Sequence, residues 1–206
     1  MPTITSVKAI QVLDSRGLPT VSCSIKLSDG SYASAIVPSG ASTGTKEALE
    51  LRDGTNAYLG KGVQKAITNI NSIIAPAIIN LDPEKQAEID KIIIDLDGTN
   101  DKSKLGANAI LAVSLAVSHV AAKSKNINLF EHFSSIYKDI TGNTPSKSLP
   151  MPMLNILNGG EHADNNIDIQ EFMIIPSNAK SFQEAMRWSS EIYWNLKNIL
   201  KQQSLS

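Results

Sequence analysis

The residues best suited to chemistry lie in one short run, 155–166, and in the apolar segment that follows it, 167–176. The run combines a Gly-Gly pair, His162 and several acids and amides. The apolar segment carries Gln170 and Glu171 side by side. Burying a carboxylate beside an amide is unfavourable unless a ligand, a metal or a partner satisfies both groups. We therefore predict a functional site at Gln170 and Glu171.

His162 lies in a polar loop rather than on an apolar face, and two interpretations of it stay open. It is either a solvated surface histidine or part of a site. Three nearby acids would suit a metal ion: Glu161, Asp164 and Asp168. However, the sequence has no His-Glu-x-x-His spacing, which is the pattern of a common zinc site.

Glu171 is a sharper candidate, because successive side chains of a strand point to opposite faces. Gln170 and Glu171 have opposite parity in the segment 167–175. In a barrel strand, one of them points inward near the strand's mouth, or a bulge lets both reach it. Taken alone, this pattern is weak support for a catalytic acid.

A loop of small residues, Pro38–Gly44, is the next candidate. Its backbone N–H groups could bind a phosphate. It is not a P-loop, because the spacing of Gly40 and Gly44 is wrong and no Gly-Lys-Ser/Thr follows. The alternatives are a plain flexible loop, or a loop in which Ser42 and Thr43 cap a helix that begins near Lys46.

The first forty residues favour an antiparallel sheet. Asp14–Gly17 follows an apolar strand, and we interpret it as an Asp–Arg pair that closes a turn. The segment 21–27 alternates apolar and polar residues, and Asp29-Gly30 follows at once, which is a strong hairpin signal. A further strand is expected at about 32–37.

The next hundred residues favour helices. Apolar residues at helical spacing mark one face of the segment 63–74. Asp82-Pro83-Glu84 is typical of a helix start. The segment 105–123 is apolar nearly all round, as a buried helix is. It is also the best candidate for a membrane span, but it is barely long enough and polar residues interrupt it. A buried helix is therefore favoured. A short amphipathic helix is expected at 129–137.

A polar segment, 141–149, is interpreted as a linker. Two short apolar strands are expected after it, at about 151–157 and 169–175. Ser181 and Glu184 form a capping-box pattern, and a stripe of apolar residues at spacings of three and four then predicts a long helix.

Composition restricts the class of protein. The chain has 206 residues, 42% of them hydrophobic and 19% charged, which is typical of a globular protein. The net charge of −1 gives no basic field for nucleic acid or an anionic membrane. The single cysteine, Cys23, excludes an internal disulfide. The N-terminus, Met1–Thr5, has no signal-peptide pattern.

Taken together, these segments resemble the enolase family, in its bacterial form. The resemblance covers essentially the whole chain, in order. It is carried by these motifs: Leu13–Gly17, Val37–Gly44, Glu47–Gly54, Tyr58–Val63, Leu96–Thr99, Lys102–Ile110, Asn158–Asn166 and Gln170–Met173.

The resemblance implies a fold and its domains. Residues 1–140 would be an α+β capping domain, a three-stranded antiparallel sheet plus helices. Residues 141–149 would be the linker. Residues 150–206 would be the start (ββα) of an enolase-type α/β barrel.

The resemblance also implies an activity, that of a lyase of glycolysis. It is the Mg2+-dependent dehydration of 2-phosphoglycerate to phosphoenolpyruvate, in which the metal stabilises the enolate. Ser42 would ligate the second Mg2+ from a closing loop. His162 would lie near the substrate, with a catalytic role. Gln170 and Glu171 would contact the substrate, and Glu171 would assist departure of the hydroxyl group.

Further expectations follow from the family. Its members are cytoplasmic, some with a surface or secreted pool, and form homodimers or larger assemblies. In the family, the carboxylates of the first Mg2+ and the catalytic lysine come later in the chain, with no counterpart here. Leu18 and Ser22 also depart from the usual pattern. We therefore expect an N-terminal portion of an enolase, inactive alone. The alternative is a non-catalytic interaction or oligomerisation module.

Overall fold

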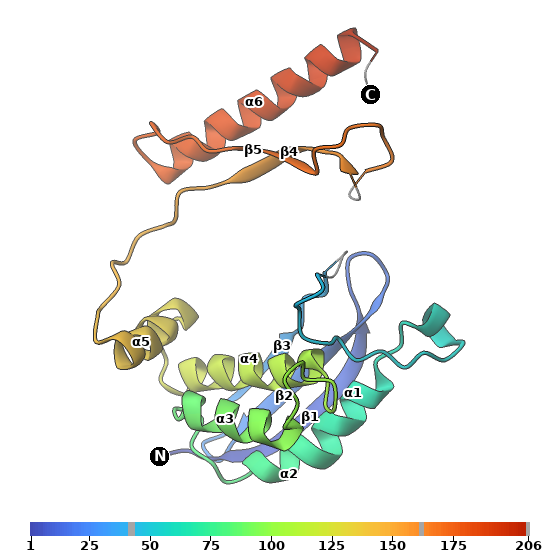
Figure 1. Ribbon diagram of the computed structural model, residues 1–206. Coiled ribbons are helices and arrows are strands. Elements are labelled where there is room, and N and C mark those ends of the chain that lie inside the picture. Colours follow the sequence, from blue (N-terminus) through green and yellow to red (C-terminus); the bar gives the residue numbers. More distant parts are fainter. Residues whose placement is uncertain (41–43, 161–162, 205–206) are drawn as a thin grey trace. The chain divides into compact units, whose positions relative to one another are not determined.

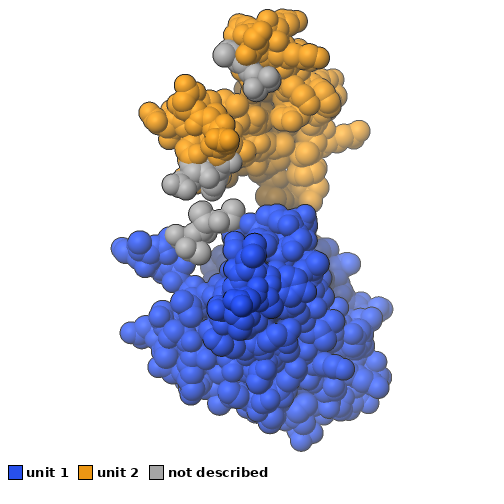
Figure 2. All heavy atoms as spheres, turned by 90° about the vertical axis from the view of Figure 1, so that its right-hand side faces the viewer, with its two compact units in different colours: residues 1–145 blue, residues 146–206 orange. Residues whose placement is uncertain are grey.

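The computed structural model describes residues 1–40, 44–160 and 163–204. The chain divides into two compact units, residues 1–145 and residues 146–206 (Figure 1; Figure 2). Each unit has its own sheet, three-stranded in unit 1 and two-stranded in unit 2.

The sheet of unit 1 is an antiparallel meander in the order β1-β2-β3. Its strands are β1 (Ile4–Leu13), β2 (Pro19–Leu27) and β3 (Tyr32–Ile36). The hairpin between β2 and β3 turns at Asp29-Gly30, as predicted. The N–H of Leu27 donates to the carbonyl of Ser31 at 2.8 Å, and Gly30 has a φ of +88°, a conformation that favours glycine. The predicted three-stranded sheet is therefore confirmed.

Helices cover one face of this sheet (Figure 1). In chain order, the helical segments are η1 (Ala57–Gly60), α1 (Gln64–Asn69), η2 (Ile70–Ile74), α2 (Ala75–Ile78), α3 (Gln86–Asp97), α4 (Ala107–Ser124) and α5 (Leu129–Thr141). The predicted apolar face of the segment 63–74 is buried: Val63, Ala66, Ile67, Ile70 and Ile74. The π-helical turn η2 lies just before Pro76, which lacks the N–H that a regular helical bond needs.

Helix α4 is the central helix of unit 1. By length and composition alone it could cross a membrane. In the structure, however, α4 packs on β2 and β3, and most of its residues are buried in the core. It faces Cys23 of β2, which is fully buried in the same cluster. Burial raises the pKa of the Cys23 thiol to about 12. The prediction of a buried helix holds.

The predicted helix start, with Asp82 as the cap and Pro83 as the first helical residue, is wrong by three residues. The carboxylate of Asp82 accepts from the N–H of Glu84 at 3.0 Å, and its carbonyl accepts from the N–H of Lys85 at 3.1 Å. These bonds close a turn, and α3 begins only at Gln86. The side chain of Gln86 is buried and accepts a bond from the hydroxyl of Ser118 at 2.8 Å. A tertiary contact therefore fixes where the helix begins.

The alternative of a helix near Lys46 is also wrong, because residues 44–56 contain no helix. The backbone at Leu49 is bonded elsewhere. Its N–H donates to the carbonyl of Asp101 at 2.7 Å, and its carbonyl accepts from the N–H of Ala107 at 2.8 Å. These long-range bonds replace the local bonds that a helix would need.

Helix α5 begins at a capping box that Asn128 and Glu131 form. It packs on α4, and it runs four residues beyond the predicted end at Tyr137. His132 lies on the packed side and is only 3% exposed. Its Nε2 has no hydrogen-bond partner within the described part of the chain.

Unit 2 contains the predicted ββα order: β4 (Leu154–Asn158), β5 (Glu171–Ile174) and α6 (Phe182–Gln202). The two strands pair antiparallel and are shorter than predicted. Ser181 caps α6 by accepting from the N–H of Glu184 at 3.1 Å. The carboxylate of Glu184 accepts from the N–H of Lys180 at 2.8 Å. In the expected capping box it would accept from the N–H of Ser181, the next residue.

Candidate functional site

Each unit has its own candidate functional region, and the region in unit 1 begins at the turn between β1 and β2. The carboxylate of Asp14 accepts from the N–H groups of Arg16 at 2.8 Å and Leu18 at 2.9 Å. The guanidinium of Arg16 is 3.0 Å away. The Leu18 bond, with a further contribution from Arg16, holds the pKa of the Asp14 carboxyl below its usual value. The pair closes the turn, as predicted.

Arg16 has a second function that the sequence did not indicate. Its Nη2 donates to the carbonyl of Ser39 at 3.1 Å, and the carbonyl of Gly40 lies at 3.5 Å. Because Ser39 and Gly40 begin the small-residue loop 38–44, Arg16 fixes the first residues of that loop to the β1–β2 turn.

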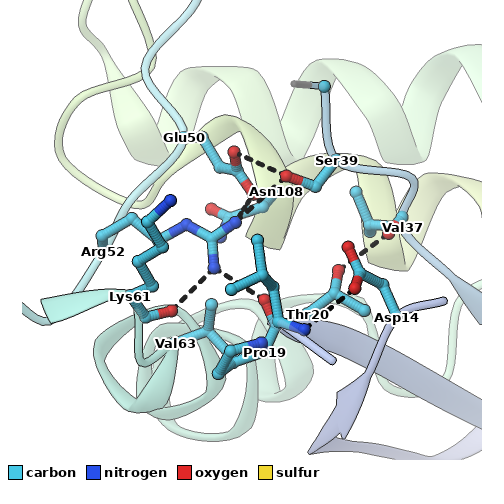
Figure 3. Close-up of polar contacts among 12 residues, drawn as sticks. Asp14, Pro19, Thr20, Val37, Ser39, Glu50, Arg52, Lys61, Val63 and Asn108 are labelled. Carbon is cyan, nitrogen blue, oxygen red and sulfur yellow. Dashed lines mark hydrogen bonds and ion pairs between the residues drawn. The ribbon is translucent and has the colours of Figure 1, made fainter. Parts of the chain in front are cut away.

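A second arginine, Arg52, also holds Ser39 (Figure 3). Arg52 Nη2 donates to the hydroxyl of Ser39 at 3.1 Å and to Glu50 at 2.5 Å. Its Nη1 donates to the carbonyls of Pro19 at 2.6 Å and Lys61 at 2.7 Å. The hydroxyl of Ser39 in turn donates to Glu50 at 3.1 Å. The start of the loop is therefore fixed through both its backbone and its side chain.

The residues that flank Arg52 tie this network to the helices. Asn108 of α4 makes two bonds to the backbone of Leu51, both at 3.1 Å. Asp53 accepts from the N–H groups of Gln64 at 2.9 Å and Lys65 at 2.8 Å, and so caps α1. The motif 50–54 thus reads as a structural junction. The closely spaced charged residues Glu50, Arg52 and Asp53 are the sequence feature that could have indicated this network.

The region in unit 2 is the turn between β4 and β5. The N–H of Gly159 donates to the carbonyl of Gln170 at 2.9 Å, and the N–H of Gly160 donates to that of Ile167 at 2.7 Å. A Cβ at Gly159 would lie 2.5 Å from the carbonyl oxygen of Ile169, so only glycine fits there. The Gly-Gly pair therefore brings the chain before β5 against the end of β4.

Gln170 and Glu171 are not both buried, contrary to the prediction. Gln170 is exposed and Glu171 is half-buried at the start of β5. The physical reason is that the ribbon of β4 and β5 has too few neighbours in unit 2 to bury both of its faces. Asp164 and Asp168 are also exposed. The predicted roles of Gln170 and Glu171 stay predictions.

Two predicted site residues, Ser42 and His162, lie outside the described residues. Among residues 1–40, 44–160 and 163–204, no three His, Cys, Asp or Glu side chains converge on a common point. The described residues therefore do not form a complete metal site. Glu161, which with Asp164 and Asp168 would suit a metal ion, lies outside them.

The fold and these sites define an α+β domain joined to a ββα segment. Residues 4–133 match the model of the enolase N-terminal domain, and residues 146–206 match that of the enolase C-terminal TIM barrel domain. The chain belongs to the enolase family. This is a family of lyases whose members generally use Mg2+, bind substrate and form oligomers.

Proposed function

We propose that residues 1–206 supply the capping domain and the first barrel elements of an enzyme that dehydrates 2-phosphoglycerate to phosphoenolpyruvate with Mg2+. We also propose that these residues do not catalyse the reaction by themselves. The ordered match to both enolase domains, over 4–133 and 146–206, is the observation that carries the proposal.

The apolar surface of unit 2 supports the second half of the proposal. A TIM barrel closes with eight strands, and unit 2 contributes β4 and β5. Large apolar side chains on this unit are exposed: Phe172, Met173, Ile175, Ile192, Trp194 and Ile199. Exposed apolar area of this kind marks a surface that another element covers. Without that cover, the substrate-side groups lack a fixed position.

Each residue is given the role that its place in the family pattern suggests. Glu171 assists departure of the hydroxyl group, and Gln170 contacts the substrate beside it. His162 acts on the substrate side, and Ser42 ligates a second Mg2+. The described residues by themselves do not form a complete site for the metal.

The proposal is tested by a turnover assay with the purified 206-residue chain of verified mass. Phosphoenolpyruvate formation is followed by ultraviolet absorbance, with Mg2+ and with a chelator. The same assay is repeated after adding a separate polypeptide that carries the remaining strands of an enolase barrel. We expect no turnover by the chain alone and Mg2+-dependent turnover after complementation. Turnover by the chain alone that the Glu171→Gln variant loses would contradict the proposed inactivity.

A second candidate is a non-catalytic interaction or oligomerisation module. It is favoured by the core of unit 1, which is continuous and is built entirely from residues 1–145. The two candidates differ in the complementation assay, because a module that only binds forms a complex without turnover.

A further inference from the structure

The two outer edges of the three-stranded sheet differ in whether other segments bond to their backbone. The outer edge of β1 is covered: Asn71 makes bonds of 2.8 Å and 3.2 Å to the backbone of Ala9. At the start of β1, the N–H of Ile4 donates to Leu81 at 2.9 Å, and its carbonyl accepts from Asn80 at 2.8 Å. Covering an edge in this way prevents it from pairing with another strand.

Among the described residues, nothing covers the outer edge of β3 in this way. Val37 donates to the carbonyl of Val21 at 3.0 Å, and the carbonyl of Ser31 accepts from Leu27 at 2.8 Å, so odd-numbered residues face β2. By the antiparallel alternation, the backbone groups of three residues point away from β2: Tyr32, Ser34 and Ile36. Within the described residues, none of these groups has a hydrogen-bond partner.

A cleft of about 540 Å³ runs beside this edge. One wall is β3 at residues 32–34, and the other is the end of α4 with the segment 126–129 that leads into α5. His119 and Lys123 of α4 line the cleft, and no acidic side chain of the described residues does. Lys123 is exposed and makes no ion pair in the described part of the chain.

We propose that the open edge of β3 binds an extended acidic peptide segment, which adds a fourth strand to the sheet. Backbone bonds to Ser34 and Ile36 give affinity, and pockets on alternate sides give specificity. Ala33 and Ala35 face the helices, whereas Tyr32 and Ile36 are about half exposed on the other face. The bound strand therefore alternates acidic side chains, which meet Lys123 and His119, with apolar side chains beside Tyr32 and Ile36.

The probe is a capped peptide of alternating valine and glutamate, added to the isotope-labelled 206-residue chain. Amide NMR shifts report where it binds. We expect changes at Tyr32, Ser34 and Ile36 and around Lys123, and none with a matched valine–lysine peptide. Binding elsewhere, or equal binding of both peptides, would overturn the proposal. Shifts of the same amides with chain concentration alone would also overturn it, because the occupant would then be a second copy.

Two variants separate the backbone contribution from the charge contribution. Ser34→Pro removes an outward N–H without removing a bond to β2, a position that an edge strand tolerates. We expect it to weaken peptide binding about tenfold. Lys123→Glu is expected to weaken binding at least as much, whereas Lys8→Glu on β1 serves as the control and leaves it unchanged. If Ser34→Pro does not fold, Lys123→Glu against Lys8→Glu still decides the question. Unchanged affinity in Lys123→Glu would contradict the proposed acidic partner.

Discussion

Units 1 and 2 differ in how much of their apolar surface they bury. Unit 1 encloses a continuous core under its sheet, with residues such as Ile25, Ile93 and Val113 fully buried. In the described part of unit 2, the only buried hydrophobic residue is Ala185, although α6 carries a long apolar stripe. A unit of this size is marginal even with a complete core. Unit 1 is therefore expected to hold its structure by itself, whereas unit 2 depends on further surface.

The largest expected effect tests this difference directly. Ile25→Ala in β2 should lower the free energy of unfolding by about 2–5 kcal/mol, because it leaves a cavity in a closed core. Trp194→Ala on α6, where the ring is about half exposed, should change it by about 0.5 kcal/mol or less. Urea unfolding followed by far-ultraviolet circular dichroism measures both values. Equal losses for the two variants would show that unit 2 has a core comparable to that of unit 1.

A second comparison concerns arginines in the two units. Arg52→Met removes the guanidinium that donates to the Glu50 carboxylate and to the Ser39 hydroxyl, and we expect a loss of about 2–3 kcal/mol. Arg187→Met removes two exposed ion pairs on α6 and should cost about 0.5 kcal/mol or less. Hydrogen exchange gives a local measure, because the amide of Leu51, which donates to Asn108 next to Arg52, should exchange faster only in Arg52→Met.

The third effect is a pH dependence within unit 1. Burial, with a smaller contribution from Lys125, lowers the pKa of His132 below its ordinary 6.5, and Glu84 partly opposes the shift. The unfolded chain therefore binds the proton first as the pH falls. The stability contribution is complete above about pH 6.5 and is lost on acidification, with a slope of at most about 1.4 kcal/mol per pH unit.

The variant His132→Leu should flatten this part of the stability curve, measured by urea unfolding between neutral and mildly acidic pH. His119→Gln is the matched control, because His119 is partly exposed on α4. An unchanged slope in His132→Leu would mean that another group carries the dependence.

The smallest effect is a local one in unit 2. Ser181→Ala removes the hydroxyl that accepts from the N–H of Glu184, and helix caps of this kind contribute about 1 kcal/mol. Because unit 2 has little core, we expect faster amide exchange in the first turn of α6 rather than a shift in global unfolding. Protection that stays unchanged at Glu184 would show that packing, and not the cap, holds this end of the helix.

Local patterns allowed much of unit 1 to be predicted. The alternation in β2, the Asp29-Gly30 turn and the apolar face of 63–74 each depend on neighbouring residues in the sequence, and all three are present. The helix start at Gln86 was missed, because its buried contact with Ser118 lies thirty-two residues away. Such a partner cannot be identified from local spacing.

The candidate site was predicted less completely for the same reason. The Asp14–Arg16 pair is local and was found, but the bonds from Arg52 to Ser39, Pro19 and Lys61 join separate loops. The burial expected for Gln170 and Glu171 depends on surfaces that pack against both faces of β5. An apolar segment in the sequence does not specify whether those surfaces are present.

The single cysteine, Cys23, can report how often the core of unit 1 opens. Cys23 lies at the centre of β2 beneath α4, and its raised pKa keeps the thiol protonated and unreactive while the core is closed. A thiol reagent can modify it only when the sheet and the helices separate. The labelling rate of the unaltered protein therefore reports how often unit 1 opens, without any added probe.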